Sequence, residues 1–255
     1  MADGRSQTRY LEEQTYSPTG RLESIMLCSL IDAIEGREVF TIDIKGAFLK
    51  AKVPEDMELI VKMDGELAKL FCEINPKFYK EEGGELYLKC LKALYGHIEA
   101  ARLFYNELDH SLTKRMGFQR NSFDPCVYNR KDEQGEIITI RTHVDDLKVS
   151  FKSREQLDAV ASELKQIYKY ITVTTDQTHD YLGMIMSHDK EIQQVTIRMD
   201  KYIQDVIDSF KDGSQEEIKV AATPATNYLF KTRNKDRFSK QNCQAKICSV
   251  SSDSG

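Results

Sequence analysis

The chain has 255 residues, of which 40% are hydrophobic and 30% are charged, and its formal net charge is −5. These values are typical of a globular protein with one large or two small domains, and the acidic balance argues against a protein that simply coats nucleic acid. No apolar run approaches the ~20 residues of a membrane span, and the six cysteines form no Cys-x-x-Cys pair that would indicate a zinc site.

The first half of the chain alternates between helical and strand-like patterns. Apolar residues recur at helical spacing over 22–34, and Gly36 is the expected stop. A second helix is predicted over 98–116, followed by Gly117 as a C-terminal cap. Strands rich in β-branched and aromatic residues are predicted over 39–44, 59–63 and 86–91.

The second half combines strand pairs with two further helices. Helices are predicted over 154–170 and 200–210, the latter capped by Asp200. Strands are predicted over 124–128, 137–142, 148–151, 171–175, 181–187 and 194–199. Hairpins mixed with helices predict an α+β fold with a mostly antiparallel sheet and helices on one face.

Two adjacent acids, Asp145 and Asp146, lie between two strand-like runs in the segment His143-Val144-Asp145-Asp146-Leu147. A turn that displays two carboxylates repels itself unless a cation neutralises it, so the pair is a candidate divalent-metal site. The alternative is a solvated turn, since Asp is a common turn residue. A third acid, Asp43, lies in an otherwise apolar strand, where a charge needs a partner or a metal.

The three acids converge if their strands are neighbours in one sheet. Such a cluster could hold two Mg²⁺ ions about 3.5–4 Å apart, the arrangement that serves nucleotidyl transfer. A phosphoacceptor receiver domain also uses an acidic pair with Mg²⁺. That fold needs parallel strands separated by helices, whereas a strand directly follows Asp146 here.

The sequence also resembles a known family, the reverse transcriptases of copia-type (pseudovirus) retrotransposons. Segments in the family's order, spread over about residues 10–225, carry the resemblance: Asp43-Ile44-Lys45-Gly46-Ala47-Phe48-Leu49, Leu94-Tyr95-Gly96, Gly117-Phe118, Asp124-Pro125-Cys126-Val127-Tyr128, Val144-Asp145-Asp146, Tyr181-Leu182-Gly183 and Thr223-Pro224. The chain departs from the family at His143, where Tyr is usual, and over 97–102, where a Lys and a Pro are missing.

The resemblance implies a right-hand polymerase palm with partial fingers and the start of a thumb. It implies an RNA-directed DNA polymerase that adds dNTPs to a primer 3′-hydroxyl with Mg²⁺ as cofactor. Asp43 and Asp145 resemble the main catalytic metal ligands, with Asp146 as a supporting acid and the backbone of Ile44 also facing the metal.

Two further groups of residues take roles from the resemblance. Phe48, Tyr95 and Gly96 resemble the nucleotide-binding residues, with Phe48 beneath the incoming sugar. The alternative for Phe48 is an ordinary core aromatic residue. The segment Tyr181-Leu182-Gly183 resembles the hairpin that grips the primer terminus.

The resemblance also implies binding partners and domain limits. The expected partners are an RNA or DNA primer–template, dNTPs, and the integrase and ribonuclease H segments of a polyprotein, which this chain lacks; no membrane partner is expected. We expect residues 1–17 to be a flexible remnant of the fingers, 18–225 the palm with partial fingers, and 226–255 a polar tail left by truncation. No targeting signal is visible, which predicts an intracellular, cytoplasmic protein. The remaining alternative is a degenerate, inactive copy that keeps the fold and a nucleic-acid groove.

Overall fold

The computed structural model describes residues 3, 15–78 and 85–213. The chain divides into two units, Met1–Ile203 and Gln204–Gly255, and the fold described below is that of the first unit. Helix α6 (Asp200–Gly213) spans the boundary and confirms the helix predicted there. The Thr223-Pro224 segment, the predicted tail and most of residues 1–17 lie outside the described residues.

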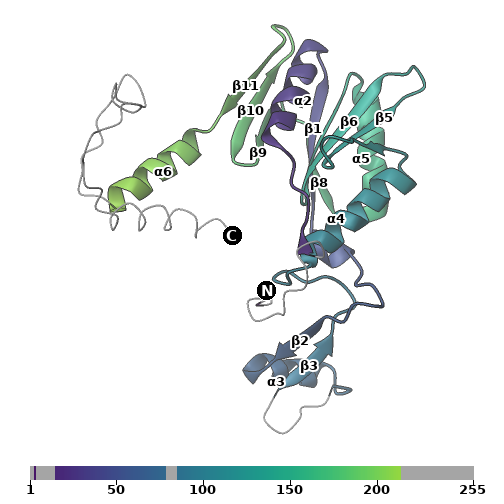
Figure 1. Ribbon diagram of the computed structural model, residues 1–255, viewed down its shortest axis with the longest axis vertical. Coiled ribbons are helices and arrows are strands. Elements are labelled where there is room, and N and C mark those ends of the chain that lie inside the picture. The colour runs from purple at the N-terminus through teal and green to yellow at the C-terminus, as the bar shows by residue number, and fades with distance from the viewer. Residues whose placement is uncertain (1–2, 4–14, 79–84, 214–255) are drawn as a thin grey trace, which may run out of the picture. The chain divides into compact units, whose positions relative to one another are not determined.

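A six-stranded sheet in which all neighbours are antiparallel forms the centre of the first unit (Figure 1). In spatial order its strands are β4 (Gln119–Arg120), β5 (Val127–Lys131), β6 (Ile137–His143), β7 (Asp146–Phe151), β1 (Glu38–Ile44) and β8 (Ile171–Thr174). Strand β1 therefore lies between β7 and β8, although about a hundred residues separate it from them in the sequence. The predicted α+β class with a mostly antiparallel sheet is confirmed.

One face of this sheet is apolar and is covered by helix α5 (Arg154–Tyr168) and helix α4 (Ala100–His110), which continues as a π-helix over Ser111–Arg115. Side chains alternate between the two faces of a strand, so every second residue of β7 points toward α5. The buried apolar residues that share this core include Phe40, Ile42, Ile140, Leu147, Val149, Phe104, Leu108, Leu157, Val160 and Leu164.

The opposite face carries charged residues and is covered by helix α2 (Leu22–Ile34) and by a three-stranded sheet. That sheet consists of β9 (Thr178–Tyr181), β10 (Met184–Asp189) and β11 (Gln194–Arg198). Lys148 of β7 donates to Asp32 of α2 at 2.9 Å, so α2 lies across the sheet from α5 (Figure 1). The sequence pattern predicted helices on one face of the sheet, and α2 lies on the other face.

Several elements differ in detail from their predicted bounds. Helix α3 (Gly65–Ile74), which follows β2 (Ile60–Met63) and precedes β3 (Leu86–Lys89), was not predicted. The single strand expected over 181–187 is divided by a turn at Leu182-Gly183 into β9 and β10. Sequence periodicity misses such turns because the apolar pattern of the two strands runs on through them.

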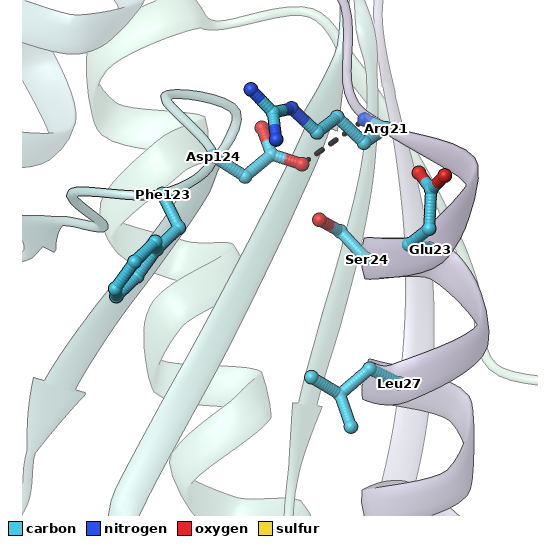
Figure 2. Close-up of a pocket in the computed structure, with 6 residues that line it drawn as sticks. All are labelled: Arg21, Glu23, Ser24, Leu27, Phe123 and Asp124. Carbon is cyan, nitrogen blue, oxygen red and sulfur yellow. Dashed lines mark hydrogen bonds between the residues drawn. The ribbon is translucent and has the colours of Figure 1, made fainter.

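The start of α2 is fixed by an acid far away in the sequence. The Asp124 carboxylate accepts from the backbone N–H of Arg21 at 3.0 Å, as Figure 2 shows, and so satisfies one of the free N–H groups at the helix start. A pocket of about 580 Å³ lies beside this contact, lined by Arg21, Glu23, Ser24, Leu27, Phe123 and Asp124. It contains none of the predicted site residues. Within the described residues, no helix is both long and apolar enough to cross a membrane.

Candidate active site

The three predicted acids meet at one end of the six-stranded sheet. Asp43 near the end of β1 pairs with Asp146 at the start of β7, and Asp146 also pairs with His143 at the end of β6. Asp145 lies in the turn between β6 and β7, and its carbonyl accepts from the backbone N–H of Ile44 at 3.2 Å. The structure thus brings Asp43, Asp145 and Asp146 together, and the backbone of Ile44 joins the acidic turn to β1.

The acidic turn is tight and strained. Only Val144 and Asp145 separate the paired residues His143 and Asp146, and Val144 has a φ of +53°. A positive φ at the first turn residue is typical of type II′ hairpins, but it is costly for a β-branched residue. Backbone strain of this kind is concentrated at functional sites.

The electrostatics of the turn reflect crowded negative charge. Burial raises the pKa of Asp145, and the nearby Asp43 raises it further. Burial also raises the pKa of Asp146, where repulsion from Asp145, Asp43 and the exposed Asp180 acts in the same direction. Each acid therefore costs energy to ionise, and a bound cation would remove that cost.

The predicted nucleotide-binding residues lie beside the acids. The rings of Phe48 and Tyr95 lie 4.5 Å apart between centroids, and Phe48 also contacts Phe104 of α4 edge-on at 6.2 Å. Burial raises the pKa of Tyr95, and the charges of Asp145 and Asp43 raise it further, which places the phenol near both carboxylates. Gly96, the next residue, is exposed and has a φ of +100°, a conformation that favours glycine.

The sequence also allows Phe48 to be an ordinary core aromatic residue, and its burial agrees with that interpretation only in part. Phe48 is half-buried and packs against the apolar core, but it is not one of the fully buried core residues. It lies on a short 3₁₀ helix, Ala47–Lys50, that directly follows β1 and Gly46. Phe48 therefore belongs partly to the core and remains partly exposed at the end of β1.

The predicted primer-binding segment forms a second tight turn. Tyr181 pairs with Met184 across Leu182 and Gly183, whose φ values are +55° and +71°. Two successive positive φ values are typical of a type I′ hairpin, and a leucine in this conformation is again strained. Asp180, the neighbour of Tyr181, is close enough to raise the pKa of Asp146. The second turn therefore lies beside the acidic one.

Sequence reasoning missed a buried pair of cations behind the acids. Arg141 and Lys148 are cross-strand partners on β6 and β7, two residues further along the sheet than His143 and Asp146. Both are almost fully buried, at 1% and 4% exposed. A signal in the sequence could have found them. Charged or polar residues alternate along each strand, and residues two apart lie on the same face, which is also the face of Asp146 and its partner Asp43.

A divalent cation fits the chemistry of the site. Among the described residues, no group of three or more His, Cys, Asp or Glu side chains is placed to hold a metal ion. Mg²⁺ does not need such a group, because it is usually bound by one or two carboxylates together with waters and substrate phosphates. Asp43 and Asp145 supply two hard oxygen donors whose mutual repulsion a cation relieves.

Comparison with known proteins identifies the family. The family described as "Reverse transcriptase (RNA-dependent DNA polymerase)" matches residues 2–224. The chain therefore belongs to the reverse transcriptase family. It is 23% identical over 238 residues to the retrovirus-related Pol polyprotein from transposon TNT 1-94 of Nicotiana tabacum. It is 28% identical over 162 residues to a transposon Ty5-1 protein of Saccharomyces cerevisiae.

The chain corresponds to part of these relatives. The matched region covers 92% of the chain but 16% of the tobacco polyprotein, and 62% of the chain but 49% of the yeast protein. Both relatives come from transposons, as the copia-type resemblance of the sequence implied.

Solved structures similar to this chain include two telomerases. Apo telomerase from Candida tropicalis, truncated from its C-terminal domain, matches 71% of this chain and 41% of its own at 9% identity and a TM-score of 0.39. Telomerase from Candida albicans in complex with a fragment of telomeric RNA matches 73% and 36% at 10% identity and a TM-score of 0.38. Scores below 0.5 do not establish a shared fold, so the palm assignment rests on the family and on the antiparallel sheet.

Proposed function

We propose that this chain is the RNA-directed DNA polymerase domain of a copia-type retrotransposon polyprotein, which adds dNTPs to a primer 3′-hydroxyl. The observation that carries the proposal is the meeting of Asp43, Asp145 and Asp146 at one sheet end, in a protein of the reverse transcriptase family. The partners are an RNA or DNA primer–template and dNTPs. Further polyprotein segments are partners too, and the family resemblance implies that they include integrase and ribonuclease H.

Asp43 and Asp145 are the metal ligands in this proposal. Divalent metal ions at such a site lower the pKa of the attacking hydroxyl and neutralise the triphosphate and the leaving pyrophosphate. The hydrogen bond from the Ile44 N–H to the Asp145 carbonyl holds the turn against β1, the strand that carries Asp43. Asp146 adds negative charge beside them and keeps the site attractive to cations.

Phe48, Tyr95 and Gly96 bind the incoming nucleotide. Because Phe48 contacts the rings of both Tyr95 and Phe104, its ring cannot easily move aside. A fixed ring beneath the sugar excludes a 2′-hydroxyl and selects deoxynucleotides. The exposed backbone at Gly96 allows close approach of the nascent base pair, since no side chain intervenes.

Primer extension tests the proposal. Purified protein is mixed with an RNA template, a labelled DNA primer, dNTPs and Mg²⁺, and the products are resolved by length. We expect extension that EDTA stops and that Asp145→Asn reduces by at least about a thousandfold, because the metal contact acts on the transition state. Asp180→Asn is the matched control, since it removes a neighbouring exposed acid from outside the proposed ligand set.

A binding titration with the same labelled primer–template, run beside the extension assay, separates the proposal from its alternative. Primer–template binding without extension would identify an inactive copy that keeps the nucleic-acid groove. Undiminished extension by Asp145→Asn would contradict the assignment of that residue to the metal.

A further inference from the structure

The bridge between Arg141 and Tyr181 connects the acidic turn to the second turn. Arg141 lies on β6, two residues before His143, and its Nη1 donates to the Tyr181 hydroxyl at 2.7 Å. The guanidinium carbon also lies 5.2 Å from the centre of the Tyr181 ring. The contact therefore combines a charge-assisted hydrogen bond with a cation–π contact, and both groups are buried.

The bridge lies at the base of both turns. Tyr181 is the last residue of β9 and directly precedes the Leu182-Gly183 turn. On the other side, only Thr142 and His143 separate Arg141 from the Val144-Asp145 turn. Because each residue belongs to a paired strand, a fixed Arg141–Tyr181 distance fixes the separation of the two turns.

The surroundings of Arg141 give its guanidinium little freedom. A Cβ atom at Gly20 would lie 2.8 Å from its Nη2, so the chain passes directly against the group. Within the described structure, Nε and Nη2 have no hydrogen-bond partner, and the bond to Tyr181 is the one found for this side chain. Asp124 adds longer-range attraction, since the positive charge of Arg141 helps to lower the pKa of that acid against the effect of burial. The hydrogen bond to Tyr181 is therefore the directional part of the contact.

We propose that Arg141 is a positioning residue that sets the place of the primer 3′ end through Tyr181. It touches neither metal nor primer, and it acts by holding the Tyr181-Leu182-Gly183 turn at a fixed place beside Asp145. This inference rests on the proposed function, because it takes the second turn as the primer-binding one. The inference adds that β9 and β10 alone do not fix the position of the primer-binding turn, because Arg141 of β6 also holds it.

The first test uses the free protein and needs no activity. Tyr181→Phe removes the hydroxyl and keeps the ring, and Tyr128→Phe is the matched control. Tyr128 is also buried and donates to Asp109 at 3.0 Å, but it lies on β5, where it pairs with Ile140 in the apolar core, and no hydrogen bond in the described structure joins it to Arg141. We expect faster hydrogen exchange over both 182–185 and 143–146 in Tyr181→Phe and at neither segment in Tyr128→Phe. Unchanged exchange at either turn in Tyr181→Phe would overturn the bridge.

The second test measures primer use. We expect Tyr181→Phe to weaken primer–template affinity roughly five- to tenfold, and to raise the KM for primer–template by a larger factor than it lowers kcat. A purely structural role would lower stability without this split, as we expect for Tyr128→Phe. The double variant Arg141→Leu with Tyr181→Phe removes the buried guanidinium together with its hydrogen-bond partner, while Asp124 keeps its backbone hydrogen bonds to Arg21 and Cys126. It should therefore fold even where Tyr181→Phe alone does not, and it should show the same loss of affinity.

The outcomes separate the two proposals. A wild-type protein that binds no primer–template contradicts the proposed function itself. A wild-type protein that binds, with Tyr181→Phe and the double variant binding equally well, overturns only the positioning role of Arg141.

Discussion

The two faces of the six-stranded sheet are held by different kinds of contact: apolar packing on one face and buried charged contacts on the other. On the α5 face, Leu147 and Val149 pack against apolar residues of α4 and α5. On the α2 face, Arg141 of β6 and Lys148 of β7 are buried against Tyr181 and Asp32. Apolar contacts are non-directional and hold elements together, whereas buried charged contacts hold only when the partner is placed accurately. The first face stabilises the fold, and the second orients α2 and the β9–β10 hairpin.

The position of the acids explains why accuracy is needed on the second face. Asp43 and Asp146 are cross-strand partners, and Asp146 and Lys148 point to the same side of β7. The buried cations therefore lie about 7 Å behind the acids along the strands, as the strand rise requires. The acids, the cations and the hairpin that Arg141 holds form one continuous polar strip.

The largest effect should follow from separating the buried pair of Lys148 and Asp32. We expect Asp32→Asn to lower the free energy of unfolding by about 3–5 kcal/mol, because it leaves the Lys148 charge buried without its counter-charge. Urea denaturation measures the change. The double variant Asp32→Leu with Lys148→Met should recover most of the loss. A small effect of the single variant would show that the polar face is not held by this pair.

A cavity on the apolar face should cost a similar but slightly smaller amount. We expect Leu157→Ala to lower the free energy of unfolding by about 2–4 kcal/mol, since Leu157 is fully buried in the α5 core. Substitutions on the two faces should differ in their effect on primer–template affinity. Leu157→Ala should leave primer–template affinity unchanged at a temperature where the protein is folded, and loss of affinity would weaken the contrast between the faces.

The polar face should also make stability depend on pH through His188. Burial lowers the pKa of His188 to about 4, and the charge of Lys148 acts in the same direction. Below pH 6.5, His188 is protonated in the unfolded chain but stays neutral in the folded chain. The free energy of unfolding therefore falls as the pH drops from 6.5 toward 4. We expect a loss of roughly 1–3 kcal/mol over this range, reduced in His188→Met and retained in Leu157→Ala. Unfolding curves at several pH values provide the measurement.

The smallest effect should be a gain in stability at the acidic turn. Burial raises the pKa of Asp146, so its ionised form costs stability as the pH rises through that pKa. Asp146→Asn removes the charge and should raise Tm at pH 7 by roughly 1–3 °C, in the absence of metal. The gain should shrink as the pH falls and the wild-type acid becomes protonated. A lower Tm at pH 7 would mean that Asp146 is stabilised by contacts other than its neighbours' charges.

The sequence predicted the apolar face well and the polar face poorly. The α5 helix and the strands that pack on it have regular apolar spacing, which reports burial directly. Asp43 and the Val144-Asp145 turn were found because acids in a strand or a tight turn violate that spacing. Arg141 and Lys148 were missed because a charge in a strand is normally solvated, and its burial depends on α2 and β9, which only the tertiary structure brings near.

The shared cation is the central claim, and Mn²⁺ binding tests it most directly. Mn²⁺ replaces Mg²⁺ at oxygen sites and can be titrated by electron paramagnetic resonance, in the presence of a dideoxy-terminated primer–template and a dNTP. We predict that a site seen in the wild type is lost in Asp43→Asn and in Asp145→Asn, and is retained in Asp180→Asn. Mn²⁺ binding that survives both of the first two substitutions would contradict the claim that Asp43 and Asp145 hold one ion between them.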